Sequence, residues 1–363
     1  MFVELHLIQN FAPSCLNRDD TNTPKDCEFG GYRRARVSSQ CLKRSVRRYF
    51  NGKAADLGIE GLLAQRTKLL ASQLTDRLEK KGKDRDEAEK IVGAVIEAAG
   101  VKTDDAGKTS VLLFVGPDEF DRLASRILGN WDDLSAAVGS GKKSKKKLPV
   151  DLTDVLREGT RAVDVALFGR MIAELKDLNV DAACQVAHAI STHRVDMEMD
   201  FYTAVDDLQP REETGAGMMG IVEFNSSCFY RYAVLDTDQL TENLDDADLA
   251  RKAAQAFVEA AIHAIPTGKQ NSMAAQNLPV YARLVVCDGA PRSLANAFLA
   301  PVRPSDEKDM ALASIEALEK HAADLDRMYG ADGVKRDMAA STYKGHGDKT
   351  VQDLVAAVGE VMG

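Results

Sequence analysis

The chain is organised around the stretch from Arg18 to Arg48, which reads RDDTNTPKDCEFGGYRRARVSSQCLKRSVRR. From Lys25 to Lys53 there are nine Lys or Arg residues against two acids, a local charge of +7. The whole chain carries −9 from 47 basic and 56 acidic residues, so the remainder carries −16. A positive segment this concentrated on an acidic protein is typical of a site that binds a polyanion.

The order of residues in this stretch predicts a turn, a strand and a helix. The Gly30–Gly31 pair favours a turn, and Tyr32–Val37 has the alternation of a short strand. Ser38 or Ser39 then offers a hydroxyl that would cap a helix beginning near Gln40. Because free backbone N–H groups at a helix start attract phosphate, this start is itself a candidate anion site.

The helix expected after this start has two different faces. Its apolar stripe recurs at i, i+4 and i+8, at Leu42, Val46 and Phe50. Its polar face recurs at i, i+3 and i+7, at Gln40, Lys43 and Arg47. The alternative is a solvated charged face without a ligand. We favour polyanion binding because the strand, the turn and the helix start would direct their cations to one patch.

Length and composition indicate a globular protein. At 363 residues, with 45% hydrophobic and 28% charged residues, the chain allows two or three compact units. The first residues alternate like a strand rather than a signal peptide, and no apolar run reaches the length of a membrane span. The six cysteines are scattered, at positions 15, 27, 41, 184, 228 and 287. This spacing predicts reduced thiols in the cytoplasm and no metal-binding cysteines.

Periodicity along the chain predicts an α+β protein. We expect a first strand at 2–8, a loop at 10–29, helices over most of 53–180, another helix at 181–192 and a projecting hairpin at 195–222. Further strands are expected at 220–224, 228–236 and 280–287, the last clear strand, with helices near 249–264, 294–299, 306–329 and 351–361. This order predicts an antiparallel ferredoxin-like or RRM-like sheet interrupted by inserts.

The expected hairpin has an unusual composition. It holds Met197, Met199, Phe201 and Tyr202 together with several glycines. These side chains cannot all pack on a two-stranded hairpin, which is only marginally stable alone. They would therefore cover a neighbouring molecule or a stack of bases; the alternative is a lid folded over an apolar patch of the same chain.

No arrangement of residues predicts catalysis. The carboxylate pairs Asp19-Asp20 and Asp206-Asp207 have Mg²⁺-binding chemistry, but adjacent acids in loops more often cap helices or pair with nearby arginines. Gly268-Lys269 lacks the earlier glycine of a phosphate loop, and Gln270 stands where that loop needs Ser or Thr. We therefore expect no catalytic residues and no cofactor.

The histidines do not predict a metal site either. His188 and His193 are five residues apart, which places them on different faces of the helix expected there. His6, His188 and His321 are all expected to be structural, and we expect no metal ion.

Short motifs in order along the chain resemble those of one family. They are Pro13–Asp20, Phe29–Gly31 with Arg34 and Arg36, Ser38–Gln40, Leu42–Arg44, Gly169–Met171, Ala187–Ile190, Thr203–Leu208, Phe229–Ala233, Gly268–Gln270 and Ser293–Phe298. With these motifs the chain resembles the CasC family of the RAMP superfamily, the RNA-binding backbone subunit of the type I-E CRISPR Cascade complex. The resemblance covers most of the chain and is weakest from residue 53 to residue 160.

The resemblance implies an architecture and a set of contacts. The palm would comprise residues 1–52, 181–194 and 223–363, the helical fingers 53–180 and the thumb hairpin 195–222. The RNA contacts expected from the basic stretch and from the resemblance are Arg18, Lys25, Arg34, Arg36, Ser38, Gln40, Lys43, Arg47, Met171, Phe201, Tyr202, Thr203, Lys269 and Gln270. The family also carries lysines for target DNA on its helical insertion. The candidates here are Lys142, Lys143, Lys145, Lys146 and Lys147, which otherwise form a solvated loop.

Function follows from the resemblance as an expectation. It implies a non-catalytic subunit that polymerises along CRISPR RNA, binds phosphates independently of sequence and presents the bases to target DNA in antiviral defence. The partners would be CRISPR RNA, target DNA, further copies of the chain and other Cascade subunits, without a membrane. Two alternatives remain: a RAMP-type endoribonuclease that uses Asp19 or Asp20, and a generic single-strand binder.

Overall fold

Two compact units make up the described chain. The structure is a computed structural model that describes residues 1–363 except 105, 140–147, 173–174 and 205–217. The first unit comprises residues 1–49, 185–235 and 255–361. The second comprises residues 50–184, 236–254 and 362–363. None of the helices in the described ranges is long and apolar enough to cross a membrane.

An antiparallel sheet forms the centre of the first unit. Among the described residues this sheet has nine strands: β1 (Phe2–Ser14), β2 (Asp26–Phe29), β3 (Tyr32–Val37), β6 (Cys184–Val186), β7 (Ala189–Ser191), β8 (Glu198–Ala204), β9 (Met218–Asp236), β10 (Tyr281–Cys287) and β11 (Val334–Ser341). Their order is β11-β10-β1-β9-β7-β3-β2, and β6 and β8 also pair with β9. The expected α+β fold with an RRM-like palm is confirmed.

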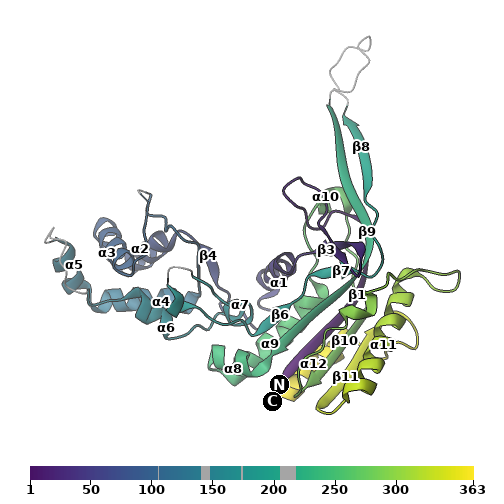
Figure 1. Cartoon of the computed structure of the whole chain (residues 1–363). Helices are drawn as coiled ribbons and strands as arrows, with labels where there is room; N and C mark the ends of the chain where they lie inside the picture. Colours follow the sequence, from purple (N-terminus) through teal and green to yellow (C-terminus); the bar gives the residue numbers. More distant parts are fainter. Residues whose placement is uncertain (105, 140–147, 173–174, 205–217) are drawn as a thin grey trace, which may run out of the picture. The chain divides into compact units, whose positions relative to one another are not determined.

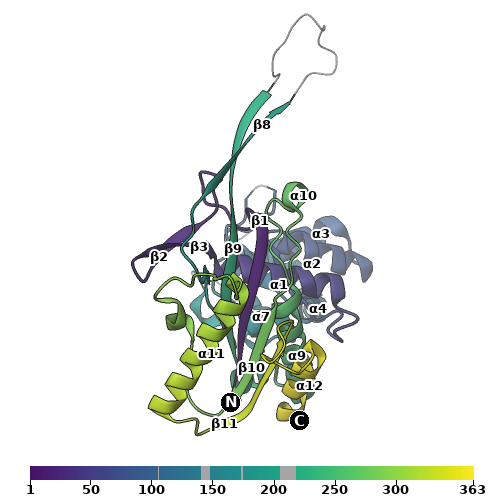
Figure 2. The ribbon, with the colours of Figure 1, turned by 90° about the vertical axis from the view of Figure 1, so that its right-hand side faces the viewer.

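Helices cover both faces of this sheet. Alternation along β1 sends Leu5 and Leu7 to one face, where they meet Val46 of α1 (Ser39–Lys53) and Phe257 of α9 (Ala247–His263) around a small cavity. The other face packs under α11 (Met310–Tyr329), whose Ile315 joins a core with strand residues. Figure 2 shows α11 running beside β10 and β11.

The remaining elements of the first unit are short connectors and a C-terminal helix. They are α10 (Gln270–Met273), the 3-10 helix η2 (Ala295–Phe298) and α12 (Val351–Met362). The hairpin of β8 and β9 extends beyond the other strands (Figure 1), and its register pairs Glu198 with Phe224 and Ala204 with Met218.

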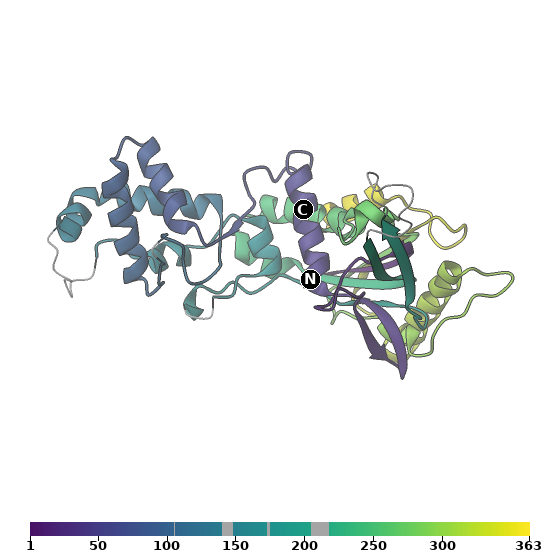
Figure 3. The ribbon, with the colours of Figure 1, turned by 90° about the horizontal axis from the view of Figure 1, so that it is seen from above.

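The second unit is mostly helical, and its helices between residues 70 and 168 are drawn in blue and teal in Figure 3. Its elements are β4 (Gln65–Thr67), α2 (Leu70–Lys80), α3 (Arg85–Ala98), β5 (Leu113–Val115), α4 (Pro117–Gly129), α5 (Trp131–Gly139), α6 (Leu152–Arg157), α7 (Val163–Phe168), η1 (Lys176–Leu178) and α8 (Thr237–Leu244). The five helices from α2 through α6 share one buried apolar core. Helices were expected over most of 53–180, and α2 and α3 are two of them.

Several local predictions are wrong. Residues 181–192 do not form a helix: they contain β6 and β7, because β7 pairs with β3 and β9. The expected loop at 10–29 contains the end of β1 and all of β2. β10 is not the last strand, since β11 follows it and pairs with it over its whole length.

Candidate nucleic-acid interface

The two arginines of β3 that were expected to bind RNA differ in exposure. Arg34 is fully buried and donates to the carbonyls of Ser191 (3.2 Å) and Phe298 (2.6 Å). It also donates to the carbonyls of Phe29 and Leu299. The expectation that Arg34 contacts phosphate is therefore wrong, because its guanidinium is used inside the protein.

Arg36 keeps a partly exposed side chain beside the start of α1. Its Nε donates to the carbonyl of Asp26 (3.1 Å), and its Nη1 donates to Nδ1 of His188 (3.1 Å). Lys25 is half-buried and lies near this pair, since its charge acts on the imidazole. Arg36 and Lys25 therefore share one positively charged patch.

The start of α1 is fixed by the loop before β2. The Ser38 hydroxyl accepts from the N–H of Cys41 (3.3 Å), so Ser38 is the predicted cap. The N–H of Ser38 in turn donates to the Asn17 side chain (2.9 Å). Ser38 is buried, whereas Gln40 in the first turn is exposed. The helix start is thus held in place with an exposed side chain beside it.

The cations of α1 lie on two rows. Leu42, Val46 and Phe50 are buried, as the apolar stripe predicted. Lys43 and Arg47 flank that stripe and are half-buried, while Arg44 and Arg48 are the exposed cations on the side away from it. Sequence reasoning chose the flanking row and missed Arg44 and Arg48, although their helical spacing of i, i+4 is visible in the sequence.

Arg44 and Arg48 line a cleft together with Arg18. Thr267 and Gly268 also line it. A side chain at position 268 is impossible without a shift, because a Cβ there would lie 2.3 Å from the carbonyl oxygen of Leu16. Three arginines from two segments therefore meet at one cleft, which has the charge required to hold phosphate groups.

Asp19 also lines the cleft, but its carboxylate is fully engaged in its own turn. One oxygen accepts from the N–H groups of Thr21 and Thr23 (both 3.0 Å), and the other accepts from the Thr23 hydroxyl (2.8 Å). These hydrogen bonds from Thr23 and Thr21 lower the pKa of Asp19 to about 2. Asp19 is therefore an ionised turn residue.

The turn after α9 places Lys269 near the same loop. Lys269 has a left-handed backbone (φ 51°) and is half-buried. The side-chain nitrogen of Gln270 donates to the carbonyls of Pro266 (2.9 Å) and Ala275 (3.1 Å). Gln270 therefore braces the turn with its amide nitrogen, and its expected contact with RNA stays a prediction.

In the second unit, one motif buries an arginine and exposes a methionine. Gly169 has a φ of 78°, and a Cβ there would lie 2.8 Å from the carbonyl oxygen of Val180. Arg170 is buried and binds the carboxylate of Glu119 at 2.6 Å. Met171 is 84% exposed beside an open hollow. Arg170 thus anchors the backbone of this motif, and Met171 exposes its side chain to solvent.

The β8–β9 hairpin has two faces, and its two aromatic residues do not share one. Phe201 lies opposite Ile221 and on the same face as Thr203, whereas Tyr202 lies opposite Gly220. A Cβ at Gly220 would meet the Tyr202 ring at 2.4 Å, so this ring covers the glycine. Phe201 and Tyr202 therefore lie on opposite faces of the hairpin and cannot be inserted together between the same two bases.

The Phe201 face of the hairpin is apolar, and no residue that the structure describes covers it. We call it the thumb face; its large residues are 61–70% exposed, namely Met199, Phe201, Met219 and Ile221. An uncovered apolar surface of this kind marks a site of interaction with another molecule.

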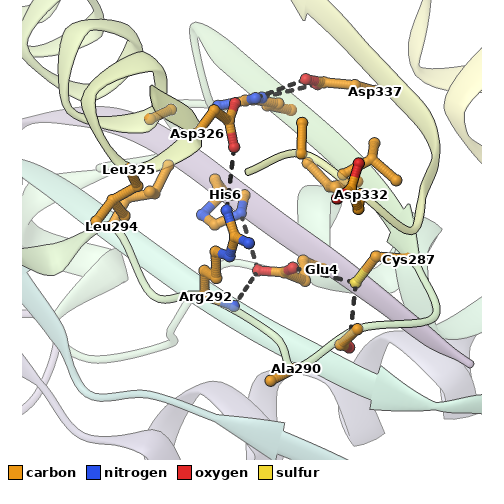
Figure 4. A pocket seen from close by; sticks show the side chains of 16 residues that line it. Glu4, His6, Cys287, Ala290, Arg292, Leu294, Leu325, Asp326, Asp332 and Asp337 are labelled. Carbon is orange, nitrogen blue, oxygen red and sulfur yellow. Dashed lines mark hydrogen bonds and ion pairs between the residues drawn. The ribbon is translucent and has the colours of Figure 1, made fainter. Parts of the chain in front are cut away.

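Buried titratable groups on the α11 side of the sheet bind one another (Figure 4). Glu4 accepts from the N–H of Arg292 (2.9 Å) and from the Tyr232 hydroxyl (3.2 Å), and lies 3.5 Å from Nε2 of His6. Nδ1 of His6 lies 2.9 Å from the Tyr230 hydroxyl. Burial lowers the pKa of His6, which favours the neutral ring. These groups hold the 289–294 loop to β1.

The described residues give the interface no metal site, and they do not include the five lysines expected to contact DNA. Within the described ranges, no three His, Cys, Asp or Glu residues are arranged to hold a metal ion. The five lysines expected to contact DNA, and the Asp206-Asp207 pair, lie outside the described residues.

Comparisons with known proteins agree with this geometry. The profile of the family described as CT1975-like protein matches residues 3–360. A chain of a solved structure titled "CRISPR RNA-guided surveillance complex, pre-nicking" is 34% identical, with a TM-score of 0.86, over 99% of this chain and 100% of that one. A chain of a "CRISPR RNA-guided surveillance complex" is 28% identical, with a TM-score of 0.77 and the same coverage. No curated protein matches the sequence.

Proposed function

The chain belongs to the CT1975-like protein family, and from this premise we propose that it is a backbone subunit of a CRISPR RNA-guided surveillance complex. Several copies assemble along one guide RNA, and each binds the phosphate backbone while the bases stay free to pair with target DNA. Because guides differ in sequence and the protein does not, binding must go through the backbone. The observation that carries this proposal is the cleft where Arg18, Arg44 and Arg48 meet.

Other parts of the basic segment, residues 18–48, support the same proposal. Lys25 and Arg36 lie beside the capped start of α1, where backbone N–H groups favour an anion. Lys43 and Arg47 continue the positive charge along the helix. Met171 of the second unit presents an apolar side chain suited to contact with a base.

The thumb face supports assembly into a multi-copy complex. Its four large apolar side chains have no cover from the part of the chain that the structure describes. We assign the neighbouring copy as their partner, since burying each such side chain stabilises an interface by about 1.5–3 kcal/mol. The five lysines at 142–147 remain a prediction for target DNA.

We also propose that the subunit does not catalyse RNA cleavage. The endoribonuclease alternative depended on Asp19 or Asp20, and both oxygens of the Asp19 carboxylate already accept hydrogen bonds from their own turn. The six cysteines are free, which supports a reducing compartment, the cytoplasm.

The test is the salt dependence of RNA binding. Lys43→Glu combined with Arg47→Glu should weaken binding of single-stranded RNA and flatten the plot of log affinity against log salt by about 0.7 for each lost phosphate contact. Arg44→Glu with Arg48→Glu should do the same at the cleft. The matched control is Lys320→Glu with Arg327→Glu on α11, where both side chains are more than three-quarters exposed.

The outcomes separate the three candidate functions. An unchanged slope in both α1 variants, with native circular dichroism, overturns the proposal. RNA recovered shortened after incubation with Mg²⁺ supports the endoribonuclease, whereas binding without a regular interval of protection supports a generic binder.

A further inference from the structure

His188 occupies a position that its sequence did not predict. It lies in the turn between β6 and β7, not in a helix, and it is exposed. The next residue, Ala189, is in register with Val37 of β3, so the turn is fixed to the sheet beside the basic segment. His188 is therefore a surface residue of the candidate interface.

The hydrogen bond from Arg36 fixes which ring nitrogen carries the proton. An arginine side chain only donates, so Nδ1 of His188 accepts at 3.1 Å and Nε2 bears the hydrogen of the neutral ring. Arg36 is itself oriented by its bond to the carbonyl of Asp26. The carboxylate of Asp26 is bound to Arg33.

The charged groups that act on the ring are both positive. Partial burial, then Arg36 and then Lys25, lower the pKa of His188 below its ordinary value. The free protein therefore holds a neutral imidazole between two cations near pH 7. A phosphodiester placed among the three groups carries one negative charge, so it would offset part of the positive field of the two cations and favour the protonated ring.

We propose that His188 contacts a phosphate of the bound RNA through Nε2 and takes up a proton at Nδ1 when the RNA binds. Arg36 then gives up its hydrogen bond to Nδ1 and turns its guanidinium towards the phosphate. This inference rests on the proposed function and adds to it a pH-dependent contact. Proton uptake on binding means that affinity rises as the pH falls, by up to about tenfold per pH unit for each bound subunit.

The experiment measures the affinity of the full chain for single-stranded oligouridine between about pH 6 and about pH 8, where histidine titrates. Wild-type protein should bind several-fold more tightly at the lower pH. His188→Gln should bind equally at both ends of the range, because glutamine does not titrate. His321→Gln on α11 is the matched control and should keep the wild-type dependence.

A second measurement reads the ring directly. The ¹⁵N shifts of His188 should report a neutral ring protonated at Nε2 in the free protein and a doubly protonated ring in the RNA complex. A ring that stays neutral in the complex, or an equal pH dependence in His188→Gln, overturns the inference. The proposed function survives either result, because it is tested by the salt slopes of the α1 variants.

Discussion

The basic segment and the thumb face are both expected at the RNA, but they are held in different ways. In the basic segment the protein itself fixes the groups: Arg34 is bound to four carbonyls, Arg36 to Asp26 and Ser38 to Asn17. On the thumb face the apolar side chains have no cover among the described residues. The difference teaches that the first surface is formed before RNA arrives, whereas the second is completed only by a partner.

The largest effect should come from removing the anchor of the basic segment. Arg34→Ala leaves four carbonyls without this donor, those of Ser191 and Phe298 in buried positions, and should lower the free energy of unfolding by at least about 3 kcal/mol. Arg36→Ala, on the same strand, should cost less than about 1 kcal/mol. Urea denaturation checks both variants. Equal losses would mean that the segment is not preformed by Arg34, and the comparison would fail.

The thumb face should show the opposite behaviour. Phe201→Ser with Ile221→Ser should change the unfolding free energy of the monomer by no more than about 0.5 kcal/mol, because both side chains are exposed. Assembly on RNA should weaken by about 2 kcal/mol per contact between copies, since buried apolar area is lost. Met218→Ser, on the Tyr202 side, is the control. A monomer that loses stability would show that this face is a lid.

The smallest effect concerns the Asp19 turn and has a defined direction with pH. The pKa of Asp19 is about 2 in the folded chain, below its ordinary value of 3.8. Its contribution to folding is therefore complete above the ordinary value and is lost as the pH falls towards the folded one. Carboxyl NMR titration should show this shift, and Asp19→Asn should abolish the difference in stability across that window while Asp20→Asn keeps it.

Sequence patterns predicted the segments whose periodicity is unambiguous. The stripe of Leu42, Val46 and Phe50 predicted α1, and helical periodicity over most of 53–180 predicted the region that contains α2 and α3. The prediction of a helix at residues 181–192 failed because alanine and isoleucine at that spacing fit either a helix or a short strand. Pairing with β3 and β9, distant in sequence, decided between them.

The candidate site was predictable as a region but not residue by residue. Arg34 and Arg36 stand two apart on one face of β3, so periodicity cannot distinguish them. The backbone of Phe298 and Leu299, more than 260 residues later, covers Arg34 alone. His188 was misplaced for the same reason, because the turn that exposes it depends on strand pairing far along the chain.

The strand β9 belongs to the hairpin and to the palm sheet at once. It runs unbroken for 19 residues, which at about 3.3 Å per residue is on the order of 60 Å. The hairpin is therefore a direct extension of the sheet, because the strand continues without a break where the hairpin leaves it. In a filament of identical subunits, the length of this strand would set the spacing between neighbouring copies. Each copy would then cover the same length of guide RNA, whatever the base sequence of the guide.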